Sequence, residues 1–215
     1  MRTAIPTSAE DMMSQIMRTT QPQLFKWEVT KETAKMVISS FYALEVHKRQ
    51  KSLVKSNDLA VVIDKIAEHM TNPKKAGLFF VGGVGCGKST MMYALREAHN
   101  YLYPSHKDIG IVIKDATDIV MQVQKQSATL DYKGMEDMLA IDDLGKEPTQ
   151  VMVFGSTIQP IVEIFESRYS RMLPMLITTN LETKQIAEKY GKRIADRCNE
   201  MFQVIVFPQD SYRRL

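Results

Sequence analysis

Residues 77–89 read Gly-Leu-Phe-Phe-Val-Gly-Gly-Val-Gly-Cys-Gly-Lys-Ser, and no other part of the chain constrains the fold class as strongly. The first five residues form a continuous apolar run, which is typical of a strand buried on both faces in a parallel sheet. The glycines that follow allow backbone conformations in which successive N–H groups point into one concavity. From Gly82 to Ser89 the stretch satisfies the pattern G-x4-G-K-[ST]. It therefore predicts a phosphate-binding loop between a strand and a helix.

Each residue type in this loop has a physical role in holding a nucleotide. Lys88, expected to be exposed in the loop, places a positive charge near the β- and γ-phosphates, and the Ser89 hydroxyl offers a ligand to Mg²⁺. The helix that begins there presents unpaired N–H groups and the positive end of its dipole to the anion. A glycine-rich turn can match by chance, but strand, loop, Lys-Ser and helix occur here in order, so ATP and Mg²⁺ are the predicted cofactors. The predicted cofactor-binding residues are Gly82, Gly83, Val84, Gly85, Cys86, Gly87, Lys88, Ser89 and Thr90.

Two carboxylates end the apolar run Met138–Ile141, which is predicted to be another buried strand. Ligands of an open α/β sheet bind at the carboxyl ends of its strands. Asp142 is therefore predicted to hold Mg²⁺ through water, beside Ser89. Asp143 is predicted to orient or deprotonate the attacking water. The alternative is a pair of helix-capping aspartates, since Gly145 breaks the strand.

Polar residues further along the chain complete an expected hydrolytic site. Asn180 follows the apolar run 174–178 and is predicted to hold the attacking water, with a turn and a helix cap as the alternative. Arg193 and Arg197 stand at i and i+4, on one face of a predicted helix. Either they reach the ATP of a neighbouring subunit as arginine fingers, or they pair with Asp196 and Glu200 on a surface helix.

Apolar runs alternate with segments of helical period, which predicts an α/β fold with a parallel sheet and helices on both of its faces. Residues 1–56 are expected to form a short helical N-terminal arm that binds a partner, and residues 57–215 the ATPase domain. The predicted strands are 77–81, 109–113, 138–141, 174–178 and 202–206, and the predicted helices are 30–51, 57–70, 88–99, 117–126, 158–171, 186–190 and 193–200.

Charge is distributed unevenly along the chain. The formal net charge is +3, and residues 1–56 hold nine Lys and Arg against five Asp and Glu. Their basic run 47–51 is either a solvated helix end or a contact for nucleic acid or an acidic partner. Apolar runs are too short for a bilayer and no signal peptide is evident, so a cytoplasmic protein without a membrane partner is expected. The two cysteines, Cys86 and Cys198, predict neither a disulfide framework nor a metal cluster.

Several segments together resemble the DnaC-type helicase-loader ATPases of the AAA+ superfamily, which include the related IstB transposition ATPases. The resemblance covers residues 75–213 and implies a P-loop NTPase fold with an AAA+ core. Its most specific segments are Tyr-Gly-Lys-Arg-Ile-Ala-Asp-Arg at 190–197 and Asp-Ser-Tyr-Arg at 210–213. The other matching segments are Gly-Val-Gly-Cys-Gly-Lys-Ser at 83–89, Ile-Asp-Asp-Leu-Gly at 141–145, Glu-Ser-Arg-Tyr at 166–169 and Thr-Thr-Asn at 178–180.

The resemblance also implies roles for single residues. It suggests that Asn180 is the sensor 1 residue and that Arg197 is an arginine finger acting in trans, with Arg193 one turn before it. Arg213 is similar to a sensor 2 residue, and for Arg168 a structural and a catalytic role are both open. The family loads the replicative hexameric helicase onto single-stranded DNA, grips the helicase with an N-terminal region and assembles through its ATPase domain. A homo-oligomer in the presence of ATP is therefore implied.

The sequence departs from some members of this family. It ends two residues after Arg213, so no C-terminal helical lid is expected, and residues 1–56 lack the cysteines of a zinc-bearing adaptor. The predicted function is an ATP-dependent loader of the replicative helicase in the initiation of DNA replication. One alternative is an IstB-like ATPase that binds duplex DNA and a transposase. A P-loop kinase is the other, but it leaves Asn180 and the two arginines unexplained.

Two segments are candidate contact sites for partners. Residues 146–155 form an expected connection after the acidic strand end, where Lys146 is predicted to meet a DNA phosphate and Phe154 to stack on a base. The alternative is that Val151, Val153 and Phe154 tuck into the core. Trp27 lies in a polar stretch and is predicted to anchor the partner, or alternatively to fold back on the first long helix.

Overall fold

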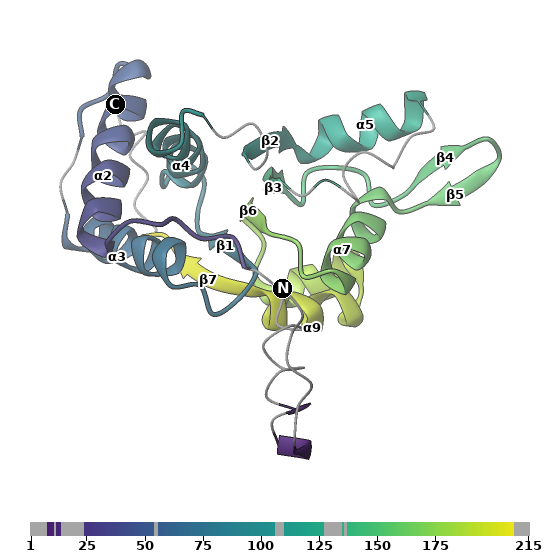
Figure 1. Ribbon diagram of the computed structural model, residues 1–215. Helices are drawn as coiled ribbons and strands as arrows, with labels where there is room; N and C mark the ends of the chain where they lie inside the picture. Colours follow the sequence, from purple (N-terminus) through teal and green to yellow (C-terminus); the bar gives the residue numbers. More distant parts are fainter. Residues whose placement is uncertain are drawn as a thin grey trace.

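A parallel sheet of five strands forms the centre of the molecule (Figure 1). The computed structural model describes residues 8–10, 12–13, 24–53, 56–105, 110–126, 135 and 137–208. The strands lie in the order β2-β3-β6-β1-β7, and every neighbouring pair is parallel. Their bounds are Gly77–Val81 for β1, Ile111–Asp115 for β2, Met138–Leu144 for β3, Met175–Thr179 for β6 and Phe202–Val206 for β7. The predicted α/β fold is confirmed.

Helices cover both faces of this sheet because alternate side chains of its strands point to opposite sides. Leu78 and Phe80 pack in a cluster with α2, α3 and α4, whereas Phe79 packs in a second cluster with α5, α7, α8 and α9. None of the helices in the described ranges is long and apolar enough to cross a membrane. The helices are α2 Lys31–Lys48, α3 Asn57–Thr71, α4 Lys88–Leu102, α5 Ala116–Gln126, α7 Pro160–Ser170, α8 Thr183–Tyr190 and α9 Lys192–Met201.

The N-terminal segment packs directly on the helices of the sheet. The Trp27 side chain is 1% exposed, and its indole N–H donates a hydrogen bond to Nδ1 of His99 in α4, at 3.0 Å. Trp27 and Ile38 belong to the same hydrophobic cluster as Leu78 and Phe80. The expectation that Trp27 anchors a partner is therefore wrong. The boundary expected after residue 56 also does not separate two hydrophobic cores.

A short antiparallel hairpin follows β3 and was not predicted. It consists of β4 (Val151–Val153) and β5 (Ser156–Ile158), which Figure 1 shows extending away from the sheet beside α5. Its two-residue turn places Phe154 at φ 48° and Gly155 at φ 81°, both in the left-handed region. Val151 is buried, but Phe154 is 92% exposed, so packing into the core holds for Val151 and not for Phe154.

Candidate functional site

The phosphate loop joins β1 to α4, and its shape depends on glycine. Gly85 and Gly87 have φ values of 85° and 97°, which L side chains rarely adopt. A Cβ at Gly82 would lie 2.9 Å from Sγ of Cys86, so a side chain there would displace the loop. Lys88 is the first residue of α4, and its Nζ donates hydrogen bonds of 2.8 Å to the carbonyl oxygens of Gly82 and Gly83. The loop is thus closed around its own lysine.

Hydroxyl and carboxylate oxygens meet at the carboxyl ends of β3 and β6. The Ser89 hydroxyl donates to Oδ1 of Asp142 at 2.8 Å, and Thr178 donates to the same oxygen at 2.5 Å. Mg²⁺ prefers such oxygen ligands and usually completes its shell with substrate phosphates and water, so these residues fit the ion. Within the described ranges, no three His, Cys, Asp or Glu side chains form a metal-binding group by themselves. Thr178 was not predicted as a site residue, although it belongs to the Thr-Thr-Asn segment at 178–180.

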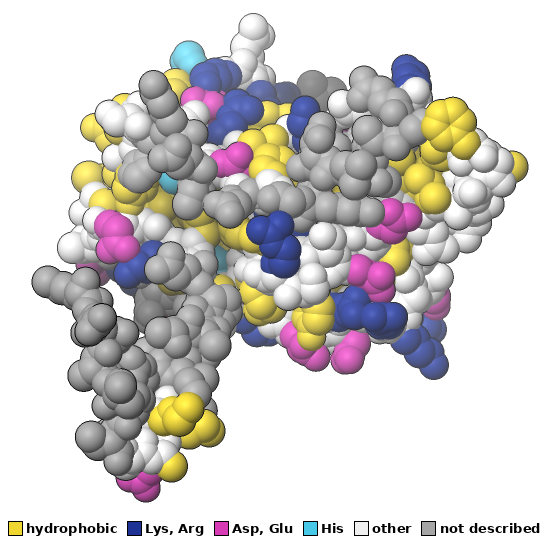
Figure 2. All heavy atoms as spheres, turned by 45° about the vertical axis from the view of Figure 1, so that its right-hand side comes forward, with side chains coloured by type: hydrophobic (Ala, Val, Ile, Leu, Met, Phe, Trp, Pro, Cys, Tyr) yellow, Lys and Arg dark blue, Asp and Glu magenta, His cyan; other side chains and the backbone are white. Residues whose placement is uncertain are grey.

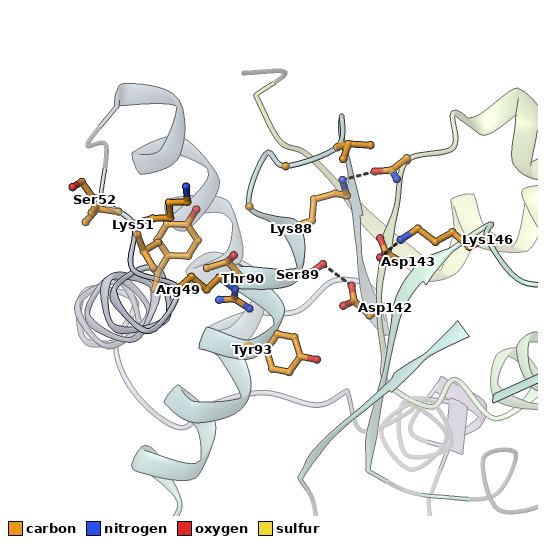
Figure 3. A pocket seen from close by; sticks show the side chains of 17 residues that line it. Arg49, Lys51, Ser52, Lys88, Ser89, Thr90, Tyr93, Asp142, Asp143 and Lys146 are labelled. Carbon is orange, nitrogen blue, oxygen red and sulfur yellow. Dashed lines mark hydrogen bonds and ion pairs between the residues drawn. The ribbon is translucent and has the colours of Figure 1, made fainter. Parts of the chain in front are cut away.

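Asp143 occupies a strained position just after Asp142. Its φ is 58°, and the register of β3 against β6 shifts between Ile141 and Leu144. The two carboxylates therefore have different partners. Asp142 is hydrogen-bonded to Ser89, whereas Asp143 forms an ion pair with Nζ of Lys146 (Figure 3). The pair raises the pKa of Lys146. Lys146, predicted to meet a DNA phosphate, therefore has Asp143 as a partner within the site.

The end of β6 also reaches the phosphate loop. Oδ1 of Asn180 accepts a hydrogen bond of 2.7 Å from Nζ of Lys88, so the predicted water-holding residue touches the predicted phosphate-binding lysine. Both residues line the same pocket as Asp142 and Asp143. The structure thus brings together Lys88, Ser89, Asp142, Asp143 and Asn180 in one site.

This pocket has a volume of about 600 Å³ and a second wall that belongs to the N-terminal segment. Figure 3 shows Arg49, Lys51 and Ser52 approaching from the end of α2, opposite the acidic strand end. Arg49 lies over the ring of Tyr93, 5.7 Å from its centroid. Only the basic run 47–51 gave a signal for this wall. The residues of this wall that were not predicted from the sequence are Tyr42, Val46, Arg49, Lys51, Ser52 and Leu53, and Tyr93 of α4 also lines the pocket.

The two candidate finger arginines lie outside the pocket of their own chain. Nη1 of Arg197 donates to Oε1 of Glu166 in α7 at 3.0 Å, and Nε of Arg193 lies 3.6 Å from the same oxygen. The Arg197 side chain is 18% exposed and that of Arg193 is 72% exposed. The expected partners, Asp196 and Glu200, are replaced by Glu166. Arg213 lies outside the described residues.

Arg168 has a structural position. Its side chain is fully buried and donates hydrogen bonds to the backbone carbonyls of Met135, Asp137 and Pro174, near the starts of β3 and β6. Burial lowers its pKa to about 10, so the guanidinium stays charged at neutral pH. Of the two roles that were open for Arg168, the structural one fits these contacts.

A buried carboxylate fixes the turn that carries Asp143. Glu147 is 1% exposed, accepts a hydrogen bond from the backbone N–H of Gly145 at 2.8 Å and accepts another from the Tyr190 hydroxyl. Lys189 donates to the carbonyl oxygens of Gly145 and Glu147 at 2.7 and 2.6 Å. Burial raises the pKa of Tyr190, which keeps its hydroxyl a donor. The turn after β3 is thus tied to α8.

No protein-family model and no curated protein sequence matches this chain. Its fold is similar to that of the DnaC helicase loader, at 22% identity over 73% of this chain and 93% of that chain, with a TM-score of 0.55. DnaI aligns at 16% identity over 86% of this chain and 97% of that chain, with a TM-score of 0.54. The replication initiator DnaA, bound to AMPPCP and single-stranded DNA, aligns at 16% identity and a TM-score of 0.53. This chain is covered to 75% by that alignment and spans half the length of that DnaA chain.

Proposed function

From the P-loop AAA+ fold that this chain shares with these replication proteins, we propose that it is a Mg²⁺-dependent ATPase of the helicase-loader type. It would load a replicative hexameric helicase onto single-stranded DNA. The observation that carries the proposal is the convergence of Lys88, Ser89 and Asp142 at one edge of the sheet, within hydrogen-bond distance of their partners. The DnaA structure with AMPPCP and single-stranded DNA supports both a nucleotide and a DNA ligand for this fold.

ATP would occupy the whole length of the pocket. Its triphosphate would replace the loop carbonyls as the partner of Lys88, since a phosphate oxygen is a stronger acceptor for a cation. Ser89 and Asp142 would hold Mg²⁺, which neutralises charge on the β- and γ-phosphates. The base would then lie toward the other wall, where Val46 and Leu53 offer apolar surface. Residues from the N-terminal segment would thus contribute to nucleotide binding.

Hydrolysis would require a second subunit. Asp143 and Asn180 line the pocket and would orient the attacking water, whereas Arg193 and Arg197 of α9 pair with Glu166 of α7, outside that pocket. An arginine finger stabilises charge that develops on the transferred phosphate and is often supplied in trans. The position of Arg197 therefore supports a homo-oligomer in the presence of ATP, in which it completes the site of a neighbour.

DNA binding would depend on the same assembly. Among the coloured side chains of the face in Figure 2, Lys and Arg are interspersed with Asp and Glu and do not merge into a broad basic patch. Phe154 at the hairpin tip would stack on a base, and Lys146 would exchange Asp143 for a backbone phosphate. Repetition of these groups along an oligomer would supply the affinity that one subunit lacks. The N-terminal arm would hold the helicase.

The proposal is tested with the purified full-length chain and a hexameric replicative helicase. We expect AMPPNP to bind more tightly with Mg²⁺ than without it, ATP to increase the oligomeric mass, and the chain to place the helicase on a single-stranded circle. Lys184→Ala, an exposed change in α8, is the matched control for Lys88→Ala. Failure of the wild-type chain to bind AMPPNP would contradict the proposed ATPase activity. Tighter binding to duplex DNA than to single-stranded DNA, together with binding to a transposase, would instead favour the IstB-like alternative.

A further inference from the structure

We propose that Glu166 and Tyr169 in α7 are positioning residues for Arg197, which set the geometry of the arginine finger before a neighbouring subunit arrives. The proposal rests on the trans role of Arg197 stated above. No role was assigned to either residue from the sequence, although both belong to the Glu-Ser-Arg-Tyr segment at 166–169.

Two contacts hold the guanidinium of Arg197 from different sides. Oε1 of Glu166 accepts the hydrogen bond from Nη1 at 3.0 Å, and the guanidinium carbon lies 4.8 Å from the centroid of the Tyr169 ring. A planar cation that is both hydrogen-bonded and stacked has less rotational freedom than a free side chain. Because that freedom is lost within the subunit, less entropy remains to be lost when a phosphate binds.

The Tyr169 ring is itself fixed in place. Its hydroxyl donates to Oε2 of Glu200 at 2.5 Å, and this bond raises the pKa of Tyr169. Glu200 lies near the end of α9, the helix that also carries Arg197. Tyr169 therefore joins α7 to α9 twice, once through its hydroxyl and once through its ring.

The anchoring of α7 to the sheet completes the arrangement. Arg168, between the two positioning residues, is buried and donates to backbone carbonyls near the starts of β3 and β6. Residues 166–169 thus contact two different elements. Arg168 fixes α7 to the sheet, while Glu166 and Tyr169 hold Arg197 of α9. These three residues of α7 connect the sheet to Arg197.

The contacts position Arg197 without consuming it. A guanidinium has five N–H donors, and among the described residues Arg197 donates only to Glu166, so four donors remain for a phosphate. The Glu166 side chain is 39% exposed, so solvent screens its charge and weakens its hold on Arg197. Arg193, 3.6 Å from the same carboxylate and 72% exposed, is held far less firmly. We infer that Arg197 is the preorganised finger.

The test compares ATP turnover in Glu166→Ala, Glu166→Gln, Tyr169→Leu and Arg197→Ala at protein concentrations where oligomers form. We expect Glu166→Ala and Tyr169→Leu to lower kcat about tenfold, because small displacements of a catalytic group are costly, and to leave KM within about twofold. Glu166→Gln keeps an oxygen acceptor and should retain more turnover than Glu166→Ala. Glu188→Gln, which removes an exposed charge from α8, is the control and should leave turnover unchanged.

Mixing subunits separates positioning from a structural role. A Glu166→Ala subunit has an intact phosphate loop, and a Lys88→Ala subunit has an intact Arg197 with its partners. Mixed oligomers should therefore regain turnover, whereas a defect confined to the Glu166→Ala subunit's own site would not be rescued.

The outcomes distinguish this inference from the proposed function. If Arg197→Ala lowers turnover while Glu166→Ala and Tyr169→Leu do not, the positioning role is wrong and the trans finger stands. Increased turnover in Glu166→Ala would mean that Glu166 keeps Arg197 away from the neighbouring site, and this result would also contradict the positioning role. If Arg197→Ala has no effect, the trans finger fails and this inference fails with it, although ATP binding remains a separate measurement.

Discussion

Lys88 Nζ lies 2.7 Å from Oδ1 of Asn180, which joins the phosphate loop to the end of β6 across 92 residues of sequence. The same Nζ donates to two carbonyl oxygens of the loop, and Lys88 is only 5% exposed. The expectation of an exposed lysine is therefore wrong. ATP would have to displace these contacts of the lysine to take their place.

Lys88→Ala should weaken nucleotide binding and should also lower the stability of the fold. We expect the affinity for AMPPNP to fall at least about tenfold, because a charge-assisted contact to phosphate is lost. The loss of internal hydrogen bonds should lower the free energy of unfolding by about 1 kcal/mol, or about 2–4 °C in Tm. Calorimetric titration and thermal unfolding measure the two effects, with Lys184→Ala as the control. An unchanged affinity would remove Lys88 from the phosphate site.

Phe154→Asn should separate DNA binding from stability. A two-residue hairpin turn with positive φ favours Asn over Phe, so this change should leave Tm unchanged or raise it. Loss of the stacked ring should weaken binding of single-stranded DNA in the presence of ATP by about 1–3 kcal/mol. Fluorescence anisotropy with a labelled oligonucleotide, over a salt series, measures the affinity. Val61→Ala removes another exposed apolar side chain and should have no effect on it.

Equal affinity of the wild-type and Phe154→Asn chains would exclude the hairpin tip from the DNA path. Lys146→Ala should then be measured by the same assay. Its loss of affinity should shrink at high salt, since a phosphate contact is electrostatic.

Two truncations should separate partner binding from folding. A chain that begins at Leu24 keeps Trp27 and α2. It should bind AMPPNP with the same affinity as the full chain but should no longer bind the helicase. A chain that begins at Asn57 loses Trp27 and Ile38, which are fully buried and contribute about 1.5–3 kcal/mol each. This shorter chain should be unstable and should not bind AMPPNP. Circular dichroism and calorimetric titration decide this, and a stable, nucleotide-binding chain from Asn57 would contradict the shared core.

His69 should make stability depend on pH. Burial lowers its pKa to about 4, against an ordinary value of 6.5, while its Nδ1 lies 3.1 Å from Oε1 of Gln203. Between these two pH values the unfolded chain binds a proton that the folded chain does not, so stability falls as the pH is lowered. The loss by pH 4 is on the order of 3 kcal/mol.

Urea unfolding at several pH values measures this dependence. His69→Gln should flatten the slope between pH 6.5 and 4, whereas His47→Gln, at an exposed position of α2, should not. Identical slopes in the wild type and His69→Gln would rule out His69 as the titrating group.

The sequence predicted the central strands β1, β3 and β6 because most of their residues are buried on both faces. The run 77–81 matches β1 at both ends, since a continuous apolar run ends where the chain leaves the core. The segment 202–206 also matches β7, although this edge strand contains Gln203 and exposes Val204 and Val206. The β4–β5 hairpin was missed because each of its strands has only three residues, too few to show a period of two. The motif residues 82–89 and 142–143 were predicted because local spacing encodes their chemistry.

The rest of the site depends on contacts between distant segments. The wall around Arg49 and the Glu166 partner of Arg197 both join elements that are far apart in the sequence. Trp27 was misassigned because its polar neighbours in sequence hide the apolar surface of α3 and α4 on which it packs. Such partners follow from the tertiary fold and have no signature in local sequence.

The packing of Trp27 against α4 limits which N-terminal segments can replace the one in this protein. Its indole needs His99 as an acceptor, and its backbone N–H donates to the carbonyl oxygen of Met70. A chimaera that receives residues 1–56 of a relative would bring a foreign aromatic to a surface shaped for this one. Transplanting partner choice would therefore require exchanging the matching faces of α3 and α4 as well, and α4 begins at the phosphate loop.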